Sequence, residues 1–468
     1  EMLRSLVGSE MCIRDRDYRI EKDSIGEVKV PADKLWGAQS QRSFENFPQD
    51  AELMPKSVIY ALVNIKKAAA IVNNRQEKLS EEKRELIVFA CNKILLGYYD
   101  DQFPLTVWQT GSGTQTNMNV NEVIAHIANK KAGADIIHPN DDVNMSQSSN
   151  DVFPTAMHIS TILKIRENLL PEIQKTIEVL KDLEEKNDII KTGRTHLQDA
   201  TPLKLSQEIS GWRTMVERDW ESIYNASQAL RKLAIGGTAV GTGLNASKDF
   251  GKEVASELTK QLDLEFESDT NKFYQLASKS ALVNVHGTIK ALASDMYKIA
   301  NDIRFLSCGP RCGIGELIIP ANEPGSSIMP GKVNPTQVES ITMVSIQIMA
   351  NDLAVSMANS QGQLQLNAYM PLIIYNMDQT ISLMSKSLAC FREHLLVGLV
   401  ANKEEIENNL ENSLMLVTSL SPHIGYDKAS QIAKYAYENK LTLREANREL
   451  DFVSEEEFDK YVNPENMV

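Results

Sequence analysis

Apolar residues recur at alternating spacings of three and four along the segment 282–306. The stripe runs through Leu282, Val285, Ile289, Leu292, Met296, Ile299, Ile303 and Leu306. This spacing places the apolar side chains on one face of a helix, where a partner helix can cover them. Residues 159–183 carry a similar pattern that Pro171 interrupts, and residues 336–358 are apolar on more than one face. The pattern predicts a bundle of long helices that assembles between subunits.

Shorter elements are predicted on either side of these helices. Residues 17–50 show short extended or irregular pieces, whereas residues 55–97 show helical patterns. Ser80 is expected to cap one of these helices and Gly97 to end it. From about residue 405 onward the pattern is shorter and more charged, which predicts two or three small helices in a separate C-terminal piece. Strand signals are scarce, so the predicted fold class is mainly α.

The charge balance limits the kinds of partner. The chain of 468 residues has 49 Lys and Arg against 63 Asp and Glu, which gives a net charge of −14. No basic run offsets this charge, so we expect no nucleic-acid partner. An anionic substrate would need a locally positive pocket. No apolar run reaches the roughly 18 residues of a membrane span, so we expect no membrane partner.

Cysteine usage and the N-terminus add two further expectations. The chain has 5 cysteines, and only Cys308 and Cys312 are close together, which favours single thiols in a reducing compartment. No dense cluster of His, Asp and Glu suggests a metal, so none is expected. Residues 1–16 lack the apolar stretch of a secretory signal. We treat them as an extension of doubtful origin and leave them out of the fold.

Four separated stretches concentrate polar side chains: 108–121, 147–151, 193–202 and 325–334. The first can be a polar loop that caps the next helix or a set of neutral donors for a carboxylate. The second resembles a capping box, in which Ser148 and Asp151 begin a helix whose free N–H groups could also receive an anion. The glycine-rich segment 236–243 does not fit a nucleotide-binding pattern, and a tight turn near a ligand is the better interpretation.

If the four stretches converge, they form a pocket for a small polycarboxylate. Hydroxyl and amide groups would bind its oxygens, and Lys332 would balance its charge. Gly325 and Gly331 give the loop 325–334 freedom to close, and Ser326 could then act as a base if N–H dipoles and a cation stabilise its alkoxide. His196 could serve the leaving group, although a packed histidine without a catalytic role is an equal alternative.

The loop Gly325-Ser-Ser-Ile-Met-Pro-Gly-Lys-Val-Asn-Pro335 resembles the signature loop of the fumarase/aspartase superfamily. The resemblance extends from about Asp17 to Val468, and within the superfamily the chain is similar to the metal-free class II fumarases. Gly193-Arg-Thr-His196 carries histidine where aspartases typically have glutamine. The loop also has Gly331 before the lysine, where the aspartase loop has alanine.

The resemblance implies a reversible hydration of fumarate to L-malate in the tricarboxylic acid cycle, through an aci-carboxylate intermediate and without cofactor or metal. It implies that Ser326 is the base, His196 the partner acid and base, and Glu339 the carboxylate that supports it. The substrate would be bound by Ser112, Gly113, Thr114, Ser148, Ser149, Asn150, Thr195, Ser327, Lys332, Val333 and Asn334. A second, non-catalytic anion site would comprise His138, Pro139, Asn140 and Asp141.

The resemblance also implies an architecture. We expect an N-terminal domain over 17–147, a central helical-bundle domain over 148–404 and a small C-terminal domain over 405–468. Four central domains would form the core of a cytoplasmic homotetramer, with each active site shared between three subunits. Two alternatives remain: another lyase of the superfamily, such as an aspartate ammonia-lyase, and a non-catalytic helical assembly protein that keeps the scaffold.

Overall fold

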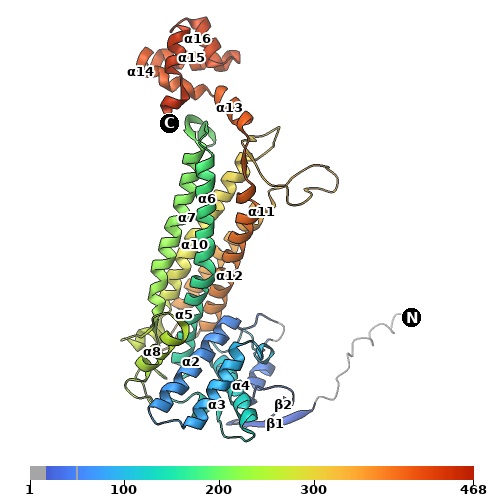
Figure 1. Ribbon diagram of the computed structural model, residues 1–468, viewed down its shortest axis with the longest axis vertical. Coiled ribbons are helices and arrows are strands. Elements are labelled where there is room, and N and C mark those ends of the chain that lie inside the picture. The colour runs from blue at the N-terminus through green and yellow to red at the C-terminus, as the bar shows by residue number, and fades with distance from the viewer. Residues whose placement is uncertain (1–16, 49–50) are drawn as a thin grey trace, which may run out of the picture. The chain divides into compact units, whose positions relative to one another are not determined.

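The computed structural model describes residues 17–48 and 51–468, and its described part is mainly helical (Figure 1). Residues 1–16, treated above as an extension, lie outside the described residues. Contacts group the described chain into two compact units. Unit 1 comprises residues 17–48, 51–168, 223–288 and 349–382, and unit 2 comprises residues 169–222, 289–348 and 383–468. The three consecutive domains remain a prediction.

The helices are of two kinds. The longer ones are α2 (Lys56–Arg75), α4 (Thr114–Ala132), α5 (Ser149–Lys164), α6 (Leu170–Lys186), α7 (Leu205–Ser227), α10 (Ser280–Leu306), α11 (Thr336–Ser360) and α12 (Met370–His394). The shorter ones are α1 (Ala38–Asn46), α3 (Glu81–Leu95), α8 (Phe250–Leu262), α9 (Lys272–Ala277), α13 (Lys403–Glu411), α14 (Ser421–Ile424), α15 (Tyr426–Asn439), α16 (Leu443–Leu450) and α17 (Glu455–Tyr461).

The described strands form two-stranded pairs. Antiparallel pairs join β1 (Tyr18–Asp23) to β2 (Gly26–Pro31), β3 (Ile190–Thr195) to β4 (Gln198–Lys204), and β7 (Leu317–Ile318) to β8 (Val400–Ala401). A parallel pair joins β5 (Lys232–Leu233) to β6 (Glu267–Ser268). These short ribbons connect helices and do not build a core of their own, which confirms the mainly α fold class.

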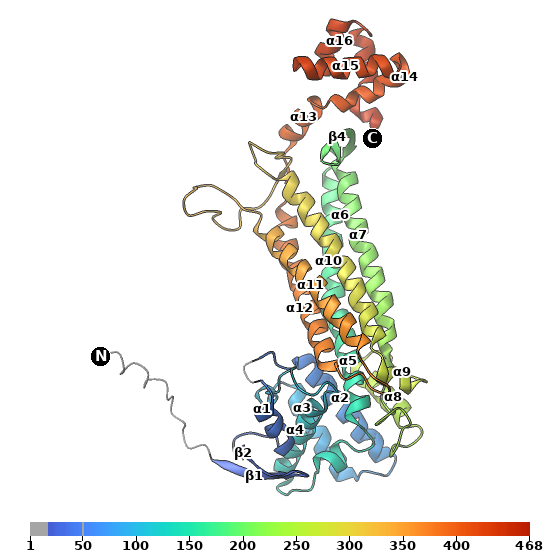
Figure 2. The same ribbon diagram turned by 180° about the vertical axis from the view of Figure 1, so that it is seen from behind.

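The heptad stripe lies on α10 and is buried along its whole length. Its eight apolar residues are at most 5% exposed, so this face is buried within the chain itself. The assembly of the bundle between subunits stays a prediction. In unit 2, Trp212 of α7 donates its indole N–H to Asp302 of α10 at 3.0 Å. Arg213 of α7 donates to Glu184 of α6 at 2.7 Å. Figures 1 and 2 show α6, α7 and α10 side by side in this unit.

Helix α1 corrects the expectation that residues 17–50 contain only extended or irregular pieces. Its N-terminal N–H groups have no capping side chain of their own and donate instead to the buried carboxylate of Glu122 on α4. The distances are 2.8 Å from Gly37 N and 2.9 Å from Gln39 N. Glu122 is more than 80 residues away in sequence, so a search for capping residues near the start of the helix does not find it.

Three local signals are confirmed. The Ser80 hydroxyl accepts the Lys83 N–H at the start of α3. Ser148 and Asp151 form a capping box at the start of α5. Pro171 lies in the first turn of α6, after a π-helical segment that interrupts the apolar pattern between α5 and α6. Each of these signals acts within a few residues, which is why the sequence alone reveals them.

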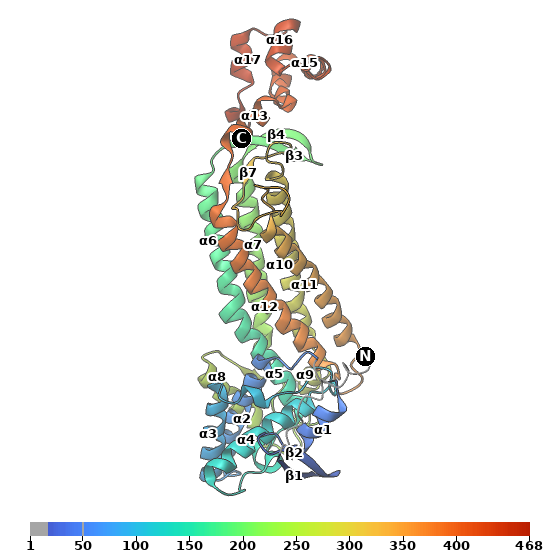
Figure 3. The ribbon, with the colours of Figure 1, turned by 90° about the vertical axis from the view of Figure 1, so that its right-hand side faces the viewer.

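Small C-terminal helices are present as predicted, but the described residues from 403 onward form five of them, α13 to α17, where two or three were expected. Figure 3 shows α15, α16 and α17 packed together. They enclose a hydrophobic cluster formed by Leu416, Val417, Leu420, Ala429, Ile432, Ala436, Leu443, Ala446 and Phe458. This part of unit 2 therefore has a core of its own.

Candidate active site

Three hydroxyl groups from two of the predicted stretches form a chain in unit 1. The Ser112 and Thr114 oxygens are 2.8 Å apart, and those of Thr114 and Ser149 are 2.9 Å apart. Thr114 is the first residue of α4 and Ser149 the first of α5. The structure therefore brings together two helix N-termini, whose free N–H groups and dipoles favour a negative charge.

A cavity of about 610 Å³ lies beside this chain of hydroxyls. Thr114, Ser148 and Ser149 line it. Asn140 and Asp141, which were predicted to belong to a second anion site, line the same cavity. The side chain of His138 accepts the Asp141 N–H at 3.1 Å and stabilises the turn that carries both residues. The two predicted groups thus adjoin one cavity in unit 1.

Gly113 is needed here for a steric reason. Its φ is 71°, in the left-handed region that side chains disfavour. A Cβ atom at this position would also lie 2.3 Å from Cδ2 of Phe153, well inside contact distance. The absence of a side chain lets the start of α4 approach α5, and this approach brings the hydroxyls of Thr114 and Ser149 together.

The glycine-rich segment 236–243 is a tight turn that borders the same cavity. Gly236, Gly241 and Gly243 have positive φ values. The N–H groups of Gly236 and Thr238 donate to the Asp151 carboxylate at 2.9 and 3.0 Å, so the turn is bound to the start of α5. The predicted tight turn is confirmed, and its closeness to a ligand remains a prediction.

Several polar residues of the cavity were missed by the sequence analysis. They are Gln39, Asn117, Asn144, Ser146, Gln147, Thr238 and Asn245. Asn117 Oδ1 and Thr238 Oγ1 are buried and have no hydrogen-bond partner among the described residues. Asn117 and Gln147 lie in stretches already marked as polar, which is the one sequence signal that could have found them. Thr238 lies in the glycine-rich segment that was interpreted as a turn near a ligand, and the others come from segments with no such signal.

The loop 325–334 belongs to unit 2 and is closed on itself. The Gly325 N–H donates to the Lys332 carbonyl, and the Asn334 amide donates to the Gly325 carbonyl, each at 2.8 Å. The loop projects beyond the helices of unit 2 (Figure 2). The apolar pair at its tip is not buried, since Ile328 is 83% and Met329 49% exposed.

The hydroxyl of Ser326 lies in a small nest of backbone N–H groups. Its Oγ accepts the N–H of Ile328 at 3.2 Å and that of Met329 at 3.3 Å. Ser326, Lys332 and Val333 line a cavity of about 340 Å³. Backbone N–H groups that converge on one oxygen stabilise negative charge on it. This is the environment that a serine needs in order to act as a base.

His196 lies at the tip of the β3–β4 hairpin, in unit 2. His196 and Leu197 form its two-residue turn with φ values of 54° and 59°. Such a turn favours asparagine and glycine, so the histidine occupies it at a conformational cost, a feature that clusters at functional sites. Thr195 ends β3 directly before this turn.

Charged groups hold the first strand of the same hairpin. Glu316 is 1% exposed and pairs with Lys191 at 3.1 Å and with Arg194 at 2.7 Å. Glu339 lies in the first turn of α11 and is exposed. Among the described residues no hydrogen bond joins His196 to Ser326 or Glu339, so one chain does not assemble the predicted catalytic set by direct contact.

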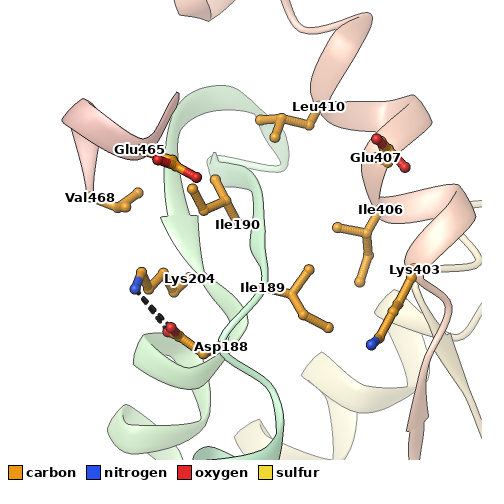
Figure 4. Close-up of a pocket in the computed structure, with 10 residues that line it drawn as sticks. All are labelled: Asp188, Ile189, Ile190, Lys204, Lys403, Ile406, Glu407, Leu410, Glu465 and Val468. Atoms are coloured by element: carbon orange, nitrogen blue, oxygen red, sulfur yellow. Dashed lines mark hydrogen bonds and ion pairs between the residues drawn. The ribbon is translucent and has the colours of Figure 1, made fainter. Parts of the chain in front are cut away.

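A second cavity of unit 2, of about 660 Å³, contains none of the predicted site residues (Figure 4). Three acidic side chains line it: Asp188, Glu407 and Glu465. They outnumber its two cations, Lys204 and Lys403, and Lys204 is already paired with Asp188 at 2.9 Å. This charge balance does not suit a dicarboxylate. Over residues 17–48 and 51–468, no three His, Cys, Asp or Glu side chains gather in a way that could hold a metal ion.

Comparisons with known proteins identify the family. A family model described as "Lyase" matches residues 26–350, and one described as "Fumarase C C-terminus" matches residues 416–468. The chain is 54% identical to the class II fumarate hydratase of Bacillus subtilis, over 97% of this chain and 99% of that protein. The chain belongs to the class II fumarate hydratases of the lyase family.

Other class II fumarate hydratases and fumarases agree with this assignment. The enzyme of Listeria monocytogenes serovar 1/2a is 56% identical over 96% of this chain and 99% of that protein. The crystal structure of the class II fumarase from Schistosoma mansoni has a TM-score of 0.94 at 43% identity, and the match covers 96% of this chain and 99% of that one. The resemblance to class II fumarases noted from the loop and the hairpin is thereby confirmed.

Proposed function

We infer that this class II fumarate hydratase interconverts fumarate and L-malate with Ser326 as the base and His196 as the partner acid. The observation that carries this assignment is the pair of N–H groups from Ile328 and Met329 that point at Ser326 Oγ. These dipoles lower the cost of forming an alkoxide. Lys332, in the same loop, adds a positive charge.

In the malate-to-fumarate direction, the Ser326 alkoxide removes a proton from C3. The electron pair of the broken C–H bond moves into the adjacent carboxylate and forms a doubly charged aci-carboxylate. The electron pair then forms the C2–C3 double bond, the C–O bond at C2 breaks, and the departing hydroxyl takes a proton from His196 to leave as water. Glu339 supports His196 in this role.

Hydroxyl, amide and backbone donors, together with the Lys332 ammonium, hold the substrate in this proposal. Ser327, Lys332, Val333 and Asn334 come from the loop, and Thr195 comes from the hairpin. Thr114, Ser148 and Ser149 come from the wall of the unit 1 cavity, and Ser112, Gly113 and Asn150 come from the starts of α4 and α5 beside it. The hydrogen-bond donors that stabilise the negative charge of the aci-carboxylate are held in place by the helix starts and the closed loop. Little reorganisation is therefore needed during the reaction. His138, Pro139, Asn140 and Asp141 form the second anion site.

We propose that the chain assembles as a homotetramer with active sites shared between three subunits. The support is a heptad stripe on α11 that the chain itself leaves uncovered: Met343 66%, Ile346 57%, Leu353 62% and Met357 58% exposed. By length and composition alone α11 could cross a membrane. However, Val338, Ile341, Ile348 and Val355 on its other face are buried within the chain, as in a bundle helix.

The same proposal keeps the three domains 17–147, 148–404 and 405–468. The separate hydrophobic cluster around Leu420 and Ile432 supports the last of them. Sharing between subunits would unite the unit 1 cavity of one subunit with the loop and the hairpin of two others. The cytoplasmic location stays a prediction.

Turnover tests the base. Fumarate formed from L-malate is followed by its absorbance, with L-aspartate as the alternative substrate. Ser326→Ala should lower kcat by roughly 10³-fold or more, because no other group accepts the C3 proton. Ser327→Ala is the matched control and should mainly raise KM. Activity with aspartate alone, or near-wild-type turnover in Ser326→Ala, would overturn the assignment.

Turnover also tests the acid. His196→Asn keeps a residue that tolerates the left-handed turn but cannot donate a proton in the same way. We expect kcat to fall by about 10²–10⁴-fold, the usual worth of general acid catalysis. An unchanged rate would remove His196 from the mechanism.

Light scattering tests the assembly. The wild type should have four times the 52.3 kDa mass of the chain. Leu353→Glu places a charge in the exposed stripe and should yield smaller species, whereas Ser360→Glu at the end of α11 should not. A wild-type monomer, or an intact tetramer in Leu353→Glu, would contradict the proposal.

A further inference from the structure

Lys66 of α2 is fully buried directly behind the wall of the unit 1 cavity. It is 0% exposed, yet it is not part of any predicted site. Its Nζ donates to Asn144 Oδ1 at 2.8 Å and to Gln147 Oε1 at 3.0 Å. Both acceptors line the cavity. The ammonium group therefore holds the segment that leads into Ser148 and the start of α5.

The two amides transmit this contact to the backbone. Asn144 donates to the Gln147 carbonyl at 3.3 Å, and Gln147 donates to the Val143 and Met145 carbonyls at 3.1 and 3.0 Å. Without the lysine, both amide oxygens would lose a charged donor inside the protein, which is costly. Lys66 thus helps to fix the conformation of 143–147, together with the Asn117 amide, which also donates to Asn144 Oδ1 at 3.2 Å.

The charge of Lys66 also matters because the cavity wall supplies none. Its described lining residues include no lysine or arginine, and Asp141 adds a negative charge. On the wall itself, a dianion in this cavity would meet hydroxyls, amides and helix starts beside the Asp141 carboxylate, and no cation among the described residues. The ammonium behind Asn144 and Gln147 is then a nearby compensating charge, in a medium where Coulomb interactions are strong.

We propose that Lys66 is a positioning residue of the active site, which holds residues 144–147 against the cavity and takes up a proton when a dicarboxylate binds there. The inference rests on the proposed function, because it assumes that the unit 1 cavity receives the substrate. It adds to that function a residue that does not touch the substrate.

The surroundings of Lys66 support the coupling. Burial lowers the pKa of Lys66 to about 7, against the opposing attraction of Asp151 on α5. Cys91 on α3 also faces it, but burial raises the pKa of that thiol to about 12, so the thiol stays neutral. An anion in the cavity favours the charged lysine and raises its pKa. Binding should therefore weaken as the pH rises above 7.

Kinetics with a matched buried lysine test this. Lys66→Met removes the charge and both hydrogen bonds. Lys279→Met is the control, since Lys279 is 1% exposed and donates to the Gln275 and Leu276 carbonyls, outside the residues that line the cavity. At pH 7 we expect Lys66→Met to raise KM for L-malate about tenfold with kcat within about threefold, a binding effect.

The pH profile adds a readout that a purely structural role would not move. KM of the wild type should rise between pH 6 and 9, and this rise should be largely absent in Lys66→Met. The control should leave KM and its pH dependence unchanged even if it unfolds at lower temperature. An unchanged KM in Lys66→Met, or the same change in both variants, would overturn the inference.

Calorimetry covers the case in which Lys66→Met does not fold. Succinate, a dicarboxylate that cannot undergo the elimination, is titrated into the wild type and Lys66→Gln at pH 8 in two buffers of different ionisation enthalpy. Proton uptake should accompany binding to the wild type and decrease in the variant. Equal uptake in both would refute the inference. If succinate binding is accompanied by proton uptake but the wild type does not turn over malate, the proposed function is refuted and the inference about Lys66 is not.

Discussion

Asp219 should make the protein less stable as the pH rises towards 8. This residue of α7 is 6% exposed, and its Oδ2 has no hydrogen-bond partner among the described residues. Burial, and then repulsion from Asp295 on α10, raise the pKa of Asp219 to about 7 from the ordinary 3.8. The described part of the chain gives this carboxylate no ion pair.

The sign of the effect follows from proton binding. Between pH 3.8 and about 7 the folded chain holds a proton on Asp219 that the unfolded chain has released. Stability therefore decreases as the pH rises through this window, and the loss is complete above pH 7. The pKa of Asp219 rises from 3.8 to about 7, and each pH unit is worth ~1.36 kcal/mol. The loss in the free energy of unfolding therefore has an upper limit of ~4 kcal/mol.

Asp219→Asn removes the charge and should recover most of this loss. We expect the free energy of unfolding to rise by about 2–4 kcal/mol at pH 8 and by less than about 1 kcal/mol at pH 4.5. Chemical unfolding followed by circular dichroism at both pH values measures the difference. The free energy comparison requires equal protein concentration, because assembly contributes to stability.

Asp302→Asn is the control for this experiment. Its carboxylate accepts the Trp212 indole N–H and pairs with Lys298, so its neutralisation should destabilise the protein or leave it unchanged at pH 8. The reasoning fails if Asp219→Asn gives the same gain at both pH values. It also fails if there is no gain at pH 8.

Three further substitutions test the local architecture by thermal unfolding. Gly113→Ala combines a left-handed backbone with a clash against Phe153 and should cost about 2–4 kcal/mol, with a matching loss of turnover. Lys191→Met leaves the buried Glu316 with one cation fewer and should cost about 3 kcal/mol. Glu122→Gln weakens the cap of α1 and should cost about 1–2 kcal/mol. A loss below about 0.5 kcal/mol in any of them would contradict the role given to that contact.

The sequence predicts those parts of the fold whose causes are local. The stripe 282–306, the capping box at Ser148 and the interruption at Pro171 each depend on spacing within one helix or one turn. By contrast, α1 depends on Glu122 from another helix, and no local pattern reports it. For α11, the sequence shows only that apolar residues occupy more than one face of the helix. It does not show which of these faces the chain itself buries and which it leaves exposed.

The candidate site also contains residues that the local sequence reveals and residues that only the three-dimensional packing reveals. Several site residues can be found from the sequence because they lie in stretches dense in polar side chains: Ser326, His196 and the hydroxyls at 112–114 and 148–149. The family resemblance then assigns their roles. Lys66 does not stand out, since it sits in an ordinary amphipathic helix and its partners Asn144 and Gln147 follow about 80 residues later. A buried charge of this kind is recognised only when the packing around it is known.

An acidic chain that binds a dianion has to confine positive potential to the site. Under the proposed function, the N-termini of α4 and α5 and neutral hydroxyls would do this in unit 1, with Lys66 behind the cavity wall. Helix ends and N–H groups attract a carboxylate without the strong, permanent pull of an exposed lysine. Lys332 lies on the same loop as Ser326, the proposed base, so closure of the loop would bring a full positive charge to the substrate together with that base. Such an arrangement favours the aci-carboxylate over the bound substrate, which is the differential binding that catalysis requires.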